Sequence, residues 1–386
     1  MRVLWASHSA QVYGAELCLL EGAKALGDRG VMVHVVVPGP GPLVERLEAA
    51  GISVTAVPYE PWLQPRSSLI GLTLRTASHA VSAWKLAAVV RQVTPDVVVT
   101  NTVTFPSAAM AARLSDVPHV WYIHEYGDLD HGFVFDYGLR STARIVAALS
   151  NRVVVNSTAV ERHFSGYITK TPIDKVYYAV PVEGPERVKA PRTPTSFEIV
   201  LVGTKQPGKR QEDAVRALAL LRTRGVDATL TLVGTGRPEY ERYLQRLADE
   251  KGVTNHVRFV GHVDDPHEYV AGADVALMCS LNEAFGRVTV EAMKLGVPVV
   301  GAASGGTVDI IRDGTTGLLY RPADSTDLAA KLEHLYRSPS EREAMGRAGR
   351  ADADRRFSED RYGRDLLGVF ERAHASREER RFSFSA

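Results

Sequence analysis

Two carboxylates eight positions apart, Glu283 and Glu291, lie in a segment whose pattern predicts a strand, a loop, a helix and a second strand. The apolar runs 275–278 and 297–300 are the expected strands, and the helix is expected to begin near Arg287. The first amides of a helix lack intrahelical acceptors and lie at the positive end of its dipole, so a phosphate or diphosphate can bind there. Two carboxylates beside that place could hold hydroxyl groups, which indicates a sugar-nucleotide site. The alternative is structural, because carboxylates also stabilise helix N-termini.

Composition narrows the class of protein. The chain has 386 residues, 45% of them hydrophobic, with 46 basic and 45 acidic side chains and a formal net charge of +1. This length allows two domains with complete cores. The charge balance argues against a dedicated nucleic-acid binder, which should show a strong basic excess. Cys18 and Cys279 each lie in an apolar run, which predicts free buried thiols in a reducing cytoplasm and argues against cysteine-bound metal.

Targeting signals are not evident, and we expect a cytoplasmic protein. Residues 3–6 already form an apolar strand pattern, which argues against a signal peptide, and no run approaches the roughly 20 apolar residues that span a bilayer. Residues 66–92 are apolar and basic, which leaves two interpretations open. The segment could lie as an amphipathic helix on the inner face of the membrane, or form one or two core-facing helices, which we favour.

Strand and helix patterns alternate in both halves of the chain, which predicts two parallel α/β domains. The expected N-terminal domain covers residues 1–183 and the C-terminal domain 197–358. Residues 184–196 are rich in proline and charge and short of aliphatic side chains, which is typical of a linker. An apolar periodicity predicts a final helix over 359–375, expected to return to the first domain, followed by a charged, disordered tail over 376–386.

Other polar positions follow predicted strands or begin predicted helices. Gly14 begins a helix after the first strand, where a ligand could approach the backbone, and His124 follows the strand 120–123. Residues 234–236 read Gly-Thr-Gly without the third glycine of a dinucleotide fingerprint, so a tight structural turn is expected and a nicotinamide dehydrogenase is disfavoured. Residues 128–130 resemble an Asp-x-Asp metal motif, but no third ligand is evident and we expect no metal site.

Taken together, these motifs resemble those of the retaining transferases of glycosyltransferase family 4 (glycosyl transferases group 1). The resemblance implies the GT-B fold, two Rossmann-like parallel-sheet domains facing across a cleft. It covers about 120 residues of the second half and extends to Gly14-Ala15-Glu16 and His124 in the first. The matching motifs are Gly203 with Lys209, Gly234-Thr235-Gly236, Glu283-Ala284-Phe285-Gly286 through Glu291-Ala292-Met293, Gly296-Val297-Pro298-Val299-Val300, Gly305-Gly306 and Asp313-Gly314-Thr315-Thr316-Gly317-Leu318.

The resemblance also implies roles for individual residues. Glu283 would hold hydroxyls of the transferred sugar, His124 would donate to the sugar or phosphate near the anomeric carbon, and Glu291 would bind the ribose hydroxyls. The family commonly has arginine where Thr204 stands, and Lys205 is expected to supply that second charge, without arginine's forked geometry. The implied donor-binding residues are Gly14, Lys205, Lys209, His262, Phe285, Gly286, Arg287, Val288 and Glu291.

The implied function is a hexosyltransferase (EC 2.4) that moves a sugar from a nucleoside-diphosphate sugar to an acceptor hydroxyl with retention of anomeric configuration. The expected donor is a UDP-sugar, with a GDP-sugar as the alternative, and neither a cofactor nor a metal is expected. The acceptor would be a carbohydrate, a lipid-linked molecule or a small molecule, and the reaction would belong to polysaccharide, glycolipid or natural-product glycoside biosynthesis. Nucleic acid is not an expected partner. The oligomeric state stays open. The alternatives are a UDP-sugar epimerase or hydrolase of the same fold and a non-catalytic sugar-nucleotide-binding protein.

Overall fold

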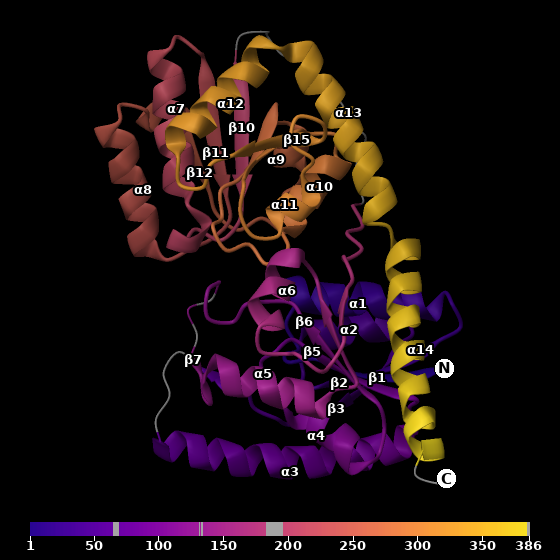
Figure 1. Cartoon of the computed structure of the whole chain (residues 1–386). Coiled ribbons are helices and arrows are strands. Elements are labelled where there is room, and N and C mark those ends of the chain that lie inside the picture. The colour runs from indigo at the N-terminus through magenta and orange to yellow at the C-terminus, as the bar shows by residue number, and fades with distance from the viewer. Residues whose placement is uncertain (65–68, 131, 133, 183–195, 384–386) are drawn as a thin grey trace. The chain divides into compact units, whose positions relative to one another are not determined.

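The computed structural model describes residues 1–386 except 65–68, 131, 133, 183–195 and 384–386 (Figure 1). The chain forms two compact units: unit 1 contains Met1–Ala179 together with Ser358–Ala386, and unit 2 contains Val180–Phe357. The expected linker, 184–196, lies outside the described residues except for Ser196. Each unit contains its own parallel sheet, as the alternating strand and helix patterns predicted.

Unit 1 is built on a seven-stranded parallel sheet in the order β3-β2-β1-β5-β6-β8-β9. Its strands are rich in valine and largely buried, which is typical of a parallel sheet covered by helices on both faces. Their bounds are β1 Arg2–Ala6, β2 Met32–Val37, β3 Ser53–Ala56, β5 Val97–Asn101, β6 His119–Ile123, β8 Arg152–Val155 and β9 Ile173–Lys175, with a separate antiparallel pair β4 Leu63–Gln64 and β7 Val134–Phe135.

Helices cover both faces of this sheet, as neighbouring residues of β1 illustrate. Successive side chains of a strand point to opposite faces. Leu4 packs into a core with residues of α3 and α4, whereas Trp5 lies against α1 and α14. The helices are α1 Gly14–Gly27, α2 Pro42–Ala49, α3 Leu69–Val93, α4 Ser107–Leu114, α5 Gly138–Leu149, α6 Thr158–Ser165 and α14 Glu359–Ser383.

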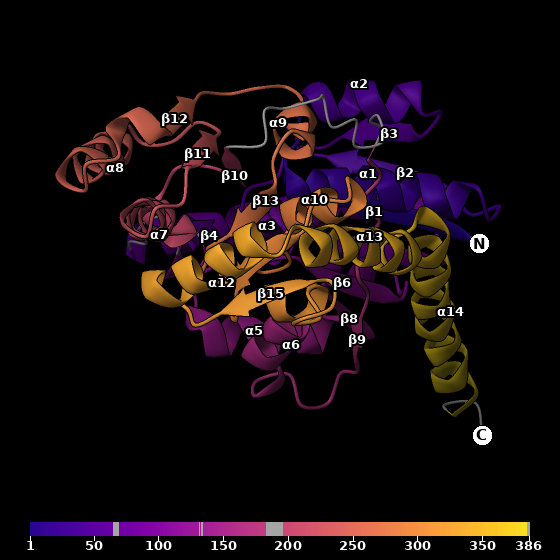
Figure 2. The same cartoon turned by 90° about the horizontal axis from the view of Figure 1, so that it is seen from above.

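Unit 2 repeats this plan with a six-stranded parallel sheet in the order β12-β11-β10-β13-β14-β15 (Figure 2). The strands are β10 Phe197–Val202, β11 Ala228–Val233, β12 Val257–Val260, β13 Val275–Met278, β14 Val299–Ala302 and β15 Gly317–Tyr320. The helices are α7 Gln211–Thr223, α8 Pro238–Glu250, α9 His267–Ala271, α10 Arg287–Lys294, α11 Thr307–Ile310, α12 Ser325–Arg337 and α13 Pro339–Arg356, with short 3-10 turns η1 Pro207–Lys209 and η2 Thr254–His256.

The C-terminal helix α14 belongs to unit 1 although it follows unit 2 in the chain. Tyr362, Leu366, Val369 and Phe370 are buried, and the Tyr362 hydroxyl donates to the carbonyl of Cys18 in α1 at 3.2 Å. The helix continues to Ser383, so the expected disordered tail after residue 375 is wrong for residues 376–383. Arginine and glutamate dominate this extension, and both have high helix propensity.

Replacing Phe370 by alanine tests how strongly α14 stabilises unit 1. The ring is fully buried and lies edge-on to Trp5, with 6.1 Å between ring centroids. We expect Phe370→Ala to lower the free energy of unfolding by about 3–5 kcal/mol, the usual cost of emptying a buried aromatic site. Urea denaturation measures it. Glu371→Ala, at the next and exposed position, is the control and should change the value by less than about 0.5 kcal/mol. Equal effects of the two substitutions would contradict this packing.

Candidate functional site

The order of the strands in unit 2 predicts where a ligand binds. From β10 the chain adds β11 and β12 on one side, and β13 with β14 and β15 on the other. Ligands of open α/β sheets bind outside the carboxyl ends of the strands where the order switches, which here is between β10 and β13. A cavity of about 180 Å³ lies there. It is lined by Leu201, Val202, Gly203, Thr204, Lys209, Leu277, Met278, Cys279, Ser280, Glu283, Gly286, Arg287 and Val288.

Lys209 and Glu283 form an ion pair at this cavity. The Lys209 ammonium donates to Glu283 Oε2 at 2.7 Å, and the two side chains are 31% and 15% exposed. Lys209 comes from the turn η1 after β10, and Glu283 from the loop after β13, so the pair joins the loops of the two strands at the switch point. The sequence predicted both residues at the site but not their contact with each other.

A glycine turn holds the backbone of Glu283 in place. The Gly306 amide donates to the Glu283 carbonyl at 2.7 Å, and Gly305 has a φ of +58°, in the left-handed region that favours glycine. A β-carbon on Gly305 would lie 2.4 Å from the carbonyl oxygen of Glu283, and one on Gly306 would lie 2.6 Å from the carbonyl oxygen of Ala284. The missing side chains therefore allow the turn to contact the loop that carries the acid.

Helix α10 begins at Arg287, as predicted, after Gly286 with a φ of 102°. Arg287 and Val288 line the cavity, so the first amides of the helix lie at its wall. Phe285 is buried against Phe357, with ring centroids 5.8 Å apart, and this contact anchors the residues that precede α10. Glu291 lies one turn further along α10 with its side chain 18% exposed and Arg287 Nε 4.0 Å away. It is not among the described residues that line the cavity.

Cys279 also lines the cavity but cannot serve as a nucleophile in this state. Burial raises the pKa of its thiol to about 12, so the thiol stays protonated near neutral pH. Cys18 is buried as well, and neither of these two cysteines forms a disulfide, as the sequence predicted.

Lys205 is bound by partners on neighbouring elements of unit 2. Its side chain is buried and its ammonium donates to Glu241 Oε2 at 2.9 Å and to the Val260 carbonyl at 3.1 Å. These acceptors lie on α8 and β12, and Lys205 is not among the described residues that line the cavity, so its expected role beside the phosphates stays a prediction. Sequence alone could not show these contacts, since the partner Glu241 is 36 residues away.

The Gly-Thr-Gly turn after β11 is structural, as expected. The Lys205 amide donates to the Thr235 carbonyl at 2.7 Å, and a β-carbon on Gly236 would lie 2.2 Å from the Lys205 carbonyl oxygen. The turn therefore fixes the loop that follows β10. His262, which follows β12, is 73% exposed beside Asp264 and does not line the described cavity.

His124 belongs to a buried hydrogen-bond network in unit 1. It follows β6 in unit 1, but it is buried, and its Nε2 lies 2.7 Å from Asn101 Oδ1, which can only accept. Its Nδ1 therefore accepts from the Tyr178 hydroxyl, which in turn accepts from the Asn156 amide at 2.6 Å. Burial lowers the pKa of His124 well below its usual value, with a further contribution from His8. The single N–H of this neutral ring is used within the network, and the expected contact with a sugar or phosphate stays a prediction.

Gly14 is exposed at the first position of α1, where the sequence placed it. The sequence missed the arrangement beneath it. The carboxylate of Glu16 is fully buried and accepts from the Ser9 hydroxyl at 2.5 Å and the Tyr13 amide at 3.3 Å, with His8 Nε2 3.2 Å away. These contacts cap the helix and shape the loop at the carboxyl end of β1. The sequence offered one signal for this cap, namely Ser9, Tyr13 and Glu16 close to the predicted start of the helix.

Substituting glycines tests the turn that holds Glu283. Gly305→Ala should destabilise the protein more than Gly314→Ala, because both glycines have positive φ but only the first would place a β-carbon against backbone atoms. The left-handed conformation alone costs roughly 1–2 kcal/mol in both variants. We expect an additional loss of at least about 1 kcal/mol for Gly305→Ala. Urea denaturation of both variants measures it, and equal losses would show that the turn does not press on Glu283.

Comparisons with known proteins agree with this description. Residues 184–352 match the family model of glycosyl transferases group 1, and residues 13–171 match that of the glycosyl transferase 4-like domain. HepE from Anabaena, solved in complex with UDP, shares the fold with a TM-score of 0.78 at 23% identity, covering 96% of this chain and 100% of HepE. TarM superposes with a TM-score of 0.74 at 11% identity, covering 96% and 98%.

Curated relatives match over part of the chain. The D-inositol 3-phosphate glycosyltransferase of Jonesia denitrificans is 34% identical over 198 residues, 50% of this chain and 46% of that protein. The N-acetyl-alpha-D-glucosaminyl L-malate synthase of Bacillus anthracis is 37% identical over 149 residues, 39% of this chain and 38% of that protein. The matches thus span less than half the length of these relatives. With two family models that match its two halves and a GT-B structure throughout, the chain belongs to the group 1 glycosyltransferases, and it resembles glycosyltransferase family 4.

Proposed function

We propose that the protein transfers a hexose from a UDP-sugar to an acceptor hydroxyl with retention of anomeric configuration. The observation that carries the proposal is the pairing of Lys209 with Glu283 beside the first turn of α10, at the switch point of the unit 2 sheet. A cation, a helix N-terminus and a carboxylate meet at one cavity. This combination suits a diphosphate joined to a sugar.

The diphosphate binds at the start of α10 in this proposal. The amides of residues 285–288 donate to its oxygens, and Lys209 and Arg287 supply positive charge. This positive charge stabilises the nucleoside diphosphate as it leaves, so the reaction runs without a divalent metal. Glu291, further along the same helix, accepts hydrogen bonds from the two ribose hydroxyls.

Donor binding exchanges the partners of Lys209. In the free protein its ammonium neutralises Glu283 at 2.7 Å. A diphosphate carries more negative charge than one carboxylate and draws the ammonium to itself. Glu283 is then released to accept hydrogen bonds from hydroxyls of the transferred sugar. The ion pair thus keeps both groups in place before the donor arrives.

In this proposal the sugar is transferred without a general base from the protein. The bond between the anomeric carbon and the β-phosphate oxygen breaks, and the acceptor oxygen bonds to that carbon on the face from which the phosphate leaves. The proton of the acceptor hydroxyl passes to the departing phosphate oxygen. The transition state resembles an oxocarbenium ion, and the amides and Lys209 stabilise the negative charge that develops on the phosphate.

A UDP-sugar is the proposed donor, with a GDP-sugar as the alternative. HepE, which shares the fold, has been solved with UDP and with UDP-glucose, and this supports uridine. The acceptor is a carbohydrate, a lipid-linked or a small molecule, and we propose that unit 1 selects it. The named relatives in Jonesia and Bacillus are a D-inositol 3-phosphate glycosyltransferase and an N-acetyl-alpha-D-glucosaminyl L-malate synthase, names in keeping with a small polar acceptor.

Two substitutions separate donor binding from transfer. Lys209→Met should weaken UDP binding roughly 10- to 100-fold, because a charge-assisted contact is lost. Glu283→Ala should leave UDP binding equal or tighter, because Lys209 loses a competing partner, while transfer falls at least about 100-fold. Calorimetry with UDP and an assay of product from UDP-glucose and candidate acceptors measure these effects.

Lys251→Met, an exposed lysine that follows α8, is the matched control and should behave like the native protein. NMR of the product should show the anomeric configuration of the donor, and EDTA should leave the rate unchanged. A Glu283→Ala variant that turns over normally would remove Glu283 from the site. Sugar release or isomerisation that is independent of every acceptor would favour the hydrolase or epimerase, and UDP binding without any turnover would favour the binding protein.

A further inference from the structure

The outer face of helix α3 exposes large apolar side chains. Leu74 and Trp84 are each 68% exposed and Val81 is 56% exposed. At about 100° per residue, their spacing of seven and three places all three on one side of the helix, together with Ala77 and Ala88. Figure 1 shows α3 along the outside of unit 1. The face is therefore a continuous apolar strip presented to the surroundings of unit 1.

The opposite face of α3 already fills the core of unit 1. Leu86, Ala87 and Val90 are buried in a cluster with Leu4 of β1 and with residues of α4. The exposed strip is thus additional to the side chains that the fold requires. A helix that is apolar on both sides either lies within a larger core or contacts a second apolar phase.

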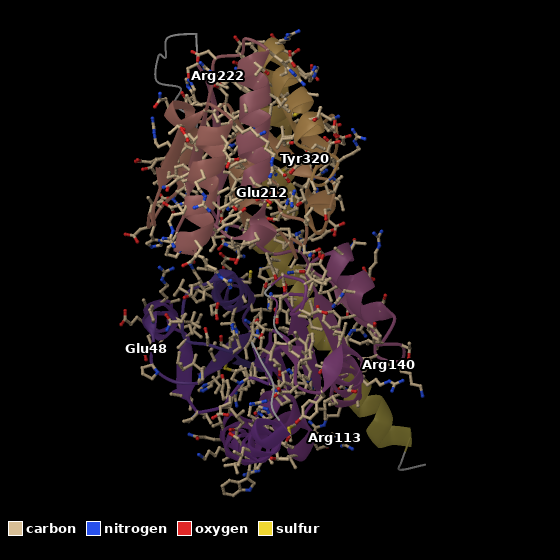
Figure 3. All side chains as sticks on the ribbon, turned by 90° about the vertical axis from the view of Figure 1, so that its left-hand side faces the viewer. Glu48, Arg113, Arg140, Glu212, Arg222 and Tyr320 are labelled. Atoms are coloured by element: carbon tan, nitrogen blue, oxygen red, sulfur yellow. The ribbon has the colours of Figure 1, made fainter. Side chains whose placement is uncertain are left out.

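The charges of α3 are all of one sign. Helix Leu69–Val93 contains three basic residues and no acidic residue. Arg75 pairs with Asp136 at 2.7 Å, whereas Lys85 and Arg91 are exposed on or beside the strip. Arg113, on the neighbouring helix α4, is also exposed (Figure 3). A surface with this combination complements negative charge next to an apolar phase.

We propose that the face of Leu74, Val81 and Trp84 lies on an anionic lipid bilayer, with Lys85 and Arg91 at the headgroups. Tryptophan favours the membrane interface, and each basic residue near an anionic surface adds to the attraction. Among the described residues no helix is long and apolar enough to cross a membrane, so the contact is with the surface. A second copy of the chain fits less well, because α3 contains no acidic residue and a two-fold contact through this face would offer Lys85 and Arg91 no acidic partner on the same helix of the other copy.

Trp84 supplies a direct probe of this contact. Of the four tryptophans, Trp5, Trp62 and Trp121 are buried, and Trp84 alone is exposed. Vesicles of phosphatidylcholine containing phosphatidylglycerol should shift the emission of the full chain to shorter wavelength and carry the protein into the pellet. Pure phosphatidylcholine vesicles should do so weakly, and high salt should reverse the binding. This test needs no turnover, so its outcome is independent of the proposed transfer reaction.

Two variants locate the contact. Leu74→Ser/Val81→Ser/Trp84→Ser should lose sedimentation with anionic vesicles, and Lys85→Glu/Arg91→Glu should lose at least tenfold in partitioning. Met32→Ser, which changes an exposed apolar residue on β2, is the control and should bind as the native protein does. Because the replaced side chains are exposed, melting temperatures should stay unchanged. The proposal is overturned if the native chain ignores anionic vesicles, if the triple variant still binds, or if the strip instead mediates a dimer that the triple variant abolishes.

Discussion

The ion pair between Lys209 and Glu283 connects the two loops on which the candidate site depends. One loop follows β10 and the other follows β13, and no strand pairing holds these loops to each other beyond the ends of the sheet. At 2.7 Å and partly buried, the pair is less screened by solvent and salt than a surface contact. The pair sets the distance between the Lys209 ammonium and the Glu283 carboxylate before any ligand binds. The glycine turn at residues 304–306 holds the backbone of Glu283 through a hydrogen bond to its carbonyl.

The two units follow the same sheet plan but use the carboxyl ends of their strands differently. In unit 2 the switch point between β10 and β13 is open as a cavity with charged walls. In unit 1 the corresponding edge is filled by hydrogen bonds among buried groups, with His124 joined to Asn101 and Tyr178. This difference supports an assignment of the donor site to unit 2. The membrane-facing strip proposed on α3 lies in unit 1, so acceptor choice and membrane contact would fall to the same unit.

Periodicity predicted the elements of the candidate site, but it carries no information on the hydrogen-bond partners of their side chains. The start of α10 at Arg287 and the strands on either side of it follow from local sequence, because the apolar runs and Gly286 act within a few residues. The directions of Lys205 and His124 depend on Glu241, Asn101 and Tyr178, which lie 23 to 54 residues away in the chain. A single sequence carries no signal for such pairings. The charge after residue 375 predicts a disordered tail, whereas the structure continues α14 to Ser383, in keeping with the helix propensity of arginine and glutamate.

A crystal structure of the protein with UDP-glucose tests the central claim most directly. The account predicts that the diphosphate lies against the first turn of α10, with the Lys209 ammonium on a phosphate oxygen and no longer on Glu283. The Glu283 carboxylate should then accept hydrogen bonds from the sugar hydroxyls. A nucleotide bound away from the β10–β13 switch point, or one bound there with the Lys209–Glu283 contact intact, would contradict it.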